Sequence, residues 1–64
     1  MKIEFRLSYI APFECASDDP EKIMDQASDD VERLQFLFLV GGVDAVVEGF
    51  VVLDDIGNIV VEHD

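Results

Sequence analysis

Residues 19–40 have the sequence DPEKIMDQASDDVERLQFLFLV, whose apolar residues recur with a helical spacing. Alternating steps of three and four residues, the spacing of one apolar helix face, separate Met24, Ala27, Val31, Leu34 and Phe38. Asp19 is suited to cap the free amide groups of a helix, and Pro20 suits the first helical position, where its missing N–H donor is harmless. We therefore predict a helix from Pro20 to about Val40.

Two alternatives to one long helix stay open. Ser28-Asp29-Asp30 is itself a suitable cap, so the segment can also be two helices, or a short helix followed by a strand at about 34–40. Gly41-Gly42 does not decide between them, because glycine is common both after a helix and in a hairpin turn. We favour the single helix because its apolar spacing continues through Phe38.

Strands are predicted on both sides of this helix. Ile3, Phe5, Leu7 and Tyr9 alternate with polar residues, which is typical of one strand with a buried and a wet face; Ala11-Pro12 ends it. Residues 46–53 and 59–62 are rich in Val, Ile and Phe, and the loop between them contains Gly57, which suits a short hairpin.

The predicted fold class is α+β: a small antiparallel β-sheet with one helix packed on one face, in the order β-α-β-β, with an extra strand at about 34–40 as the alternative. Residues 1–64 form a single domain, since the chain is short and has no linker. Both faces of the strand at 46–53 are apolar, and one helix covers only one of them. A second copy of the chain or another partner is expected to cover the other face.

Charge restricts the partners of the protein. Fifteen acidic residues against four Lys and Arg give a formal net charge of −11, which argues against direct contact with nucleic acid or an anionic membrane. No apolar run is long enough to span a membrane, and the N-terminus alternates polar and apolar residues, unlike a signal peptide. The lone Cys15 suits a reducing compartment. We expect a cytoplasmic protein whose partner is basic.

No pattern in the sequence predicts catalysis, a cofactor or a metal site. His63 stands near the C-terminus, and Cys15 has no His nearby in the sequence to activate it. The loop at 54–58 lacks the alternating oxygen ligands and the distal Glu of a calcium loop. The glycines at 41, 42 and 49 do not match a phosphate-binding pattern. We therefore expect a protein that is not an enzyme.

Five acidic residues in and before the predicted helix also recur at steps of three and four: Asp18, Glu21, Asp25, Asp29 and Glu32. They would form a ridge about 21 Å long with a charge about every 5 Å, compared with about 3.4 Å along one DNA strand. A basic groove shaped for nucleic acid would accept such a ridge. A second edge can come from acids outside the helix, namely Glu14, Asp44, Glu48, Asp54, Asp55 and Glu62. The predicted partner-binding residues are Asp18, Glu21, Asp25, Asp29, Glu32, Asp54 and Asp55.

In size, charge and layout of its acids, the whole chain resembles the nucleic-acid mimics that phages and mobile elements make against restriction enzymes, CRISPR complexes or host polymerases. The resemblance implies an inhibitor that acts in the host cell and blocks the basic site of a nucleic-acid-binding protein or complex. Two other functions stay open. One is an antitoxin or immunity protein that neutralises a basic toxin; the other is a small adaptor or assembly subunit that binds through its apolar sheet face.

Overall fold

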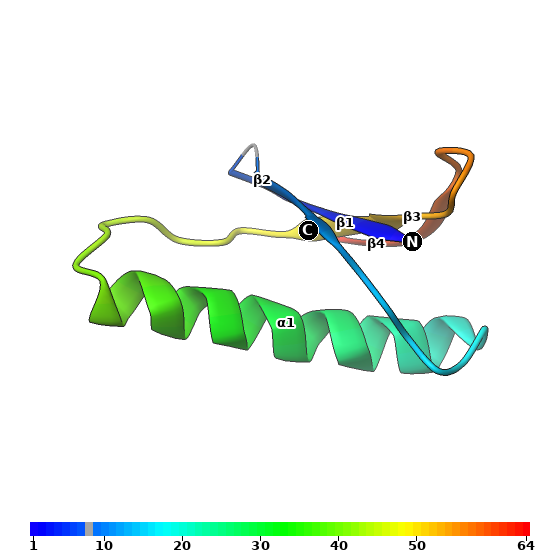
Figure 1. The fold of residues 1–64 in the computed structure, drawn as a ribbon, viewed down its shortest axis with the longest axis horizontal. Coiled ribbons are helices and arrows are strands. Elements are labelled where there is room, and N and C mark those ends of the chain that lie inside the picture. The colour runs from blue at the N-terminus through cyan, green and yellow to red at the C-terminus, as the bar shows by residue number, and fades with distance from the viewer. Residues whose placement is uncertain (8) are drawn as a thin grey trace.

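The computed structural model describes residues 1–7 and 9–64, which form one helix and a four-stranded sheet (Figure 1). The strands are all antiparallel and lie side by side in the order β2-β1-β3-β4. The helix packs on one face of the sheet, so the predicted α+β class is confirmed. In chain order the elements are β1 (Lys2–Phe5), β2 (Tyr9–Pro12), α1 (Pro20–Val40), β3 (Phe50–Leu53) and β4 (Ile59–His63).

Helix α1 has the predicted bounds. The Asp19 side chain accepts a hydrogen bond of 3.1 Å from the Glu21 N–H, and Pro20 occupies the first turn. The helix ends where the Gly41 N–H donates to the Leu37 carbonyl, at 2.9 Å, and Gly42 turns the chain with a φ of 71°. Residues 34–40 are therefore helical, and the alternative of a strand there is wrong.

The N-terminal strand was predicted as one element, and the structure shows a hairpin instead. The chain reverses after Phe5, and β2 returns beside β1 with Ile3 opposite Ala11 and Phe5 opposite Tyr9. The order is therefore β-β-α-β-β, with one strand more than predicted. The alternation gave no sign of the reversal, because residues 3, 5, 9 and 11 face the same side whether or not the chain turns back between them.

The second hairpin, β3–β4, is confirmed, and its loop is organised by Asp54. One carboxylate oxygen of Asp54 accepts hydrogen bonds from the backbone N–H groups of Ile56, at 3.0 Å, and Asn58, at 2.8 Å. Gly57 adopts the positive φ expected of it, 91°. Strand β3 begins at Phe50 rather than at residue 46, because residues 43–49 run back along the helix instead of pairing in the sheet.

The hydrophobic core lies between the helix and the inner face of the sheet. Helix α1 contributes Ile23 and Ala27, and the three central positions Ile3, Val52 and Val61 lie opposite one another on neighbouring strands. Fully burying each larger side chain contributes roughly 1.5–3 kcal/mol to folding. The buried set is Ile3, Phe5, Phe13, Ile23, Ala27, Phe50, Val52 and Val61.

The helix is longer than the sheet that covers it. Twenty-one helical residues span roughly 31 Å, whereas strands of four or five residues span roughly 13–17 Å. Figure 1 shows the sheet lying over the N-terminal part of α1, while the C-terminal part extends past it beneath the returning segment 43–49. The last turns of the helix are consequently left without a sheet to pack on.

Candidate partner-binding surface

Four of the predicted site residues form a continuous acidic ridge on α1. Glu21, Asp25, Asp29 and Glu32 are exposed and recur at steps of four, four and three residues. This spacing places them on the face of the helix turned away from the buried Ile23 and Ala27. We call these four residues the acidic ridge. The helix backbone holds them in a row of roughly 16 Å.

The ridge carboxylates form no ion pair within the described residues, although Lys22 and Arg33 lie within one helical turn of them. The ion pairs of residues 1–7 and 9–64 join the Met1 amino group to Asp55, Arg6 to Asp64 and Arg33 to Asp30. None of them includes a ridge carboxylate. Neighbouring ridge charges are about 5 Å apart, which is within the screening length of about 8 Å at physiological salt, so their potentials add. The outer face of α1 therefore presents a row of like charges to a partner.

The other three predicted site residues are placed differently. Asp18 is exposed but precedes the N-cap Asp19, so the helix does not fix its position. Asp54 and Asp55 lie in the β3–β4 loop, in the sheet layer and not on the outer face of α1 (Figure 1). The Asp54 carboxylate accepts hydrogen bonds from backbone N–H groups of its own loop. The Asp55 carboxylate is 3.2 Å from the Met1 amino group. The structure thus brings the helical acids together and does not bring the loop acids to them.

The residues with catalytic or metal-binding chemistry are placed as follows. His63 is exposed at the end of β4, with its ring centroid 5.5 Å from that of Phe50. Cys15 is half-buried in the connection before α1 and packs against the core. In the described part of the chain, no three His, Cys, Asp or Glu side chains are grouped so as to hold a metal ion. Across the same residues, no helix has the length and apolar character needed to cross a membrane.

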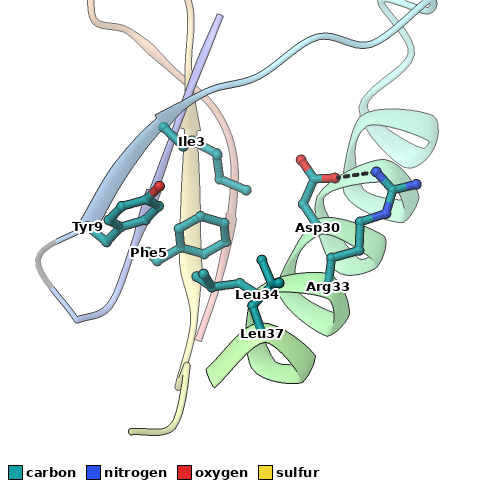
Figure 2. A pocket seen from close by; sticks show the side chains of 8 residues that line it. Ile3, Phe5, Tyr9, Asp30, Arg33, Leu34 and Leu37 are labelled. Carbon is teal, nitrogen blue, oxygen red and sulfur yellow. Dashed lines mark ion pairs between the residues drawn. The ribbon is translucent and has the colours of Figure 1, made fainter. Parts of the chain in front are cut away.

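A small apolar groove, not predicted from the sequence, lies between α1 and the β1–β2 hairpin (Figure 2). Its volume of about 160 Å³ suits one apolar side chain, since a cavity of about 150 Å³ holds a benzene ring. Asp30 and Arg33 lie on the helix side of the groove, where the Arg33 guanidinium is 3.9 Å from the Asp30 carboxylate. The apolar lining is Ile3, Phe5, Tyr9, Ala11, Leu34 and Leu37.

A second surface that we did not predict surrounds the C-terminal end of α1. Its helical members are 63–77% exposed, and residues 34–43 contain no charged side chain. We call this surface the apolar end; it consists of Phe36, Leu37, Leu39, Val40, Val43 and Val46. The signal for it was present in the sequence, because the five consecutive apolar residues 36–40 point to all sides of a helix and one sheet cannot cover them all.

The outer face of the sheet carries both apolar and charged side chains. Val51 and Leu53 of β3 lie on it, but they are half-buried. Charged side chains flank them on the neighbouring strands, with Glu4 and Glu62 opposite Val51 and Lys2 opposite Leu53. Exposed apolar side chains also occur on this face, where Ile10 opposite Glu4 is 58% exposed and Ile59 opposite Leu53 is 60% exposed, but the helix end has more of them.

Comparisons of the chain with protein families, curated proteins and solved structures found no significant match. What the protein binds is therefore inferred from the charge and geometry of the acidic ridge, the groove and the apolar end.

Proposed function

We propose that the protein is a non-enzymatic acidic inhibitor that mimics the charge of nucleic acid and blocks the basic site of a nucleic-acid-binding protein or complex. The observation that carries this proposal is the acidic ridge: four exposed carboxylates in a row on one helix, none of them in an ion pair within the described residues. Inhibitors of restriction enzymes or of CRISPR complexes encoded by phages or mobile elements are the class of protein that this corresponds to.

The spacing of the ridge supports this function. Its charges follow one another about every 5 Å along the helix, and the phosphates of one DNA strand about every 3.4 Å along the duplex axis. A groove whose Lys and Arg side chains are arranged for phosphates can therefore pair with several ridge carboxylates at once. Because α1 is a single capped helix, the row is held in place before binding, which lowers the entropic cost of association.

The energetic cost of the ridge supports it as well. Exposed helix faces commonly alternate Glu with Lys, which gains a few tenths of a kcal/mol per pair, whereas here acid follows acid at i,i+4. Such a row costs stability within the isolated chain. It becomes favourable when a basic partner is bound, and long-range attraction then also speeds association at low salt.

The test is to immobilise the protein and capture proteins from a lysate of the host cell at low salt. We expect the captured proteins to be basic nucleic-acid binders that are released both by salt and by competing duplex DNA. The variant Asp25→Asn/Asp29→Asn/Glu32→Gln should lose them, because it removes three ridge charges with little change in shape.

The matched control is Glu4→Gln/Glu14→Gln/Glu62→Gln, which changes the net charge equally at exposed positions outside the ridge. Retention by the control and loss by the ridge variant would support the proposal. Equal capture by both variants, or capture that DNA does not compete, would contradict it. A captured nuclease encoded beside this chain would instead favour the antitoxin function, which the same ridge can serve.

A further inference from the structure

The apolar end is large for an exposed surface. Its six side chains expose on the order of 600 Å² together, distributed around the helix end, which is a large apolar area for one region of a monomeric protein. The sheet cannot cover it, because the strands end before the last turns of α1. An exposed apolar surface of this kind is typical of a protein–protein contact.

We propose that a second copy of this chain covers the apolar end, with the two α1 helices packed antiparallel and crossing near Leu37. This inference is independent of the proposed function. The chain carries both halves of a self-complementary contact, because the groove of Figure 2 and the exposed helix end meet at Leu37, which belongs to both. A two-fold axis near Leu37 brings Phe36, Leu37 and Val40 of each copy, which lie within about 100° of one another around α1, against the same residues of the other copy, next to the groove.

Charge favours a second copy in the antiparallel orientation. The uncharged segment 34–43 is bordered by Arg33 on one side and by Asp44 on the other. The Arg33 side chain is 77% exposed, and its one ion pair, with Asp30, is long at 3.9 Å. In the antiparallel pair, Arg33 of each copy lies beside the C-terminal end of the partner helix and Asp44, where the helix dipole is negative and the last turn has no basic residue.

Repulsion between the two acidic ridges makes a parallel arrangement of the α1 helices unfavourable. In a parallel pair the two ridges would lie side by side, within the screening length, and would repel each other. In the antiparallel pair, each ridge begins five residues, about 7.5 Å, from the crossing point and extends away from it. The ridges are then at least about 15 Å apart along the axis, well beyond a screening length of about 8 Å. The uncharged end is thus the surface through which two chains of charge −11 can approach.

The test is sedimentation velocity of the full chain over a concentration series at fixed salt. We expect a monomer–dimer equilibrium whose dissociation constant rises about tenfold or more in Phe36→Glu and in Val40→Glu. Ile56→Glu is the matched control, since Ile56 is 82% exposed in the β3–β4 loop, at the opposite end of the molecule, and its change should leave the equilibrium as it was. Circular dichroism checks that each variant keeps its helix.

The orientation is tested by a charge exchange. Arg33→Asp and Asp44→Arg should each weaken the dimer, and the double variant should recover most of the loss, because the two charges meet across the interface. A chain that stays monomeric throughout the series, or a dimer that neither glutamate variant weakens, would overturn the proposal. A double variant weaker than both single variants would overturn the antiparallel arrangement.

Discussion

Gly49 lies where three parts of the chain come together, and its lack of a side chain makes the approach possible. A Cβ at this position would lie 2.5 Å from the His63 carbonyl oxygen and 3.0 Å from the Arg6 Cδ. The Gly49 carbonyl also accepts a hydrogen bond of 2.9 Å from the Arg6 N–H. The position thus joins the end of β1 to the start of β3 and the end of β4.

We expect Gly49→Ala to lower the free energy of unfolding by about 1–3 kcal/mol, because the backbone of β4 has to move to admit the methyl group. Urea denaturation of the variant and the parent at equal protein concentration measures this. A variant of unchanged stability would show that the strand ends separate at little cost.

Gln35 fixes the segment that returns from the helix to the sheet. Its side-chain amide donates to the Ala45 carbonyl, at 2.9 Å, and accepts from the Val47 N–H, at 3.1 Å. One side chain therefore satisfies two backbone groups of a segment that belongs to no strand. These two hydrogen bonds hold residues 43–49 beside the helix.

We expect Gln35→Met, which keeps the size and removes both hydrogen bonds, to cost about 1–2 kcal/mol and to speed hydrogen exchange at the Val47 amide. The control is Gln26→Met, since the half-buried Gln26 side chain makes no hydrogen bond within the described residues. Equal losses in the two variants would mean that Gln35 acts through packing alone.

At the scale of the element, α1 combines two faces with different requirements. Its inner face is stabilised by burial, while its outer face holds like charges at i,i+4 between Glu21 and Asp25 and between Asp25 and Asp29. The helix is therefore less stable than its core packing alone would make it. This is a cost that folding by itself does not require.

We expect Asp29→Lys to raise the free energy of unfolding by a few tenths of a kcal/mol, since the attraction of the new cation to Asp25 at i−4 and Glu32 at i+3 exceeds its repulsion from Arg33 at i+4. Thermal and urea unfolding should both show the gain. Glu14→Lys makes the same change in net charge outside the helix and should gain less. A larger gain in Glu14→Lys would assign the repulsion to net charge and not to the ridge.

At the scale of the whole molecule, 15 acidic residues share a fold whose principal dimensions are 34 × 19 × 19 Å. Charges at such separations repel throughout the compact state, and salt weakens this repulsion. We expect moderate NaCl to raise the stability by about 1 kcal/mol, or roughly 4–8 °C in Tm, measured by calorimetry at fixed pH and protein concentration.

The same salt should weaken binding to a basic partner, so that stability and binding change in opposite directions. The triple ridge variant Asp25→Asn/Asp29→Asn/Glu32→Gln provides the control, because its Tm should respond less to salt than that of the parent. A Tm that falls with NaCl in the parent would contradict this electrostatic account of the fold.

The features that depend on local chemistry could be predicted from the amino-acid sequence. Asp19 and Pro20 defined the start of the helix, the three-four spacing carried it to Val40, and Gly57 with its neighbours specified the second hairpin. The positions of the ridge acids on the helix followed from the same spacing. These features could be predicted because each depends on backbone preferences within a few residues.

The ends of these elements, and the surfaces that they leave uncovered, depend on contacts between distant segments. The N-terminal segment forms a hairpin, and Phe13 of a connecting segment is buried. The Asp54 carboxylate bonds to its own loop. The last turns of α1 lie beyond the sheet. Each of these outcomes depends on which distant segments pair and how far they reach, and periodicity within one segment carries no information about either.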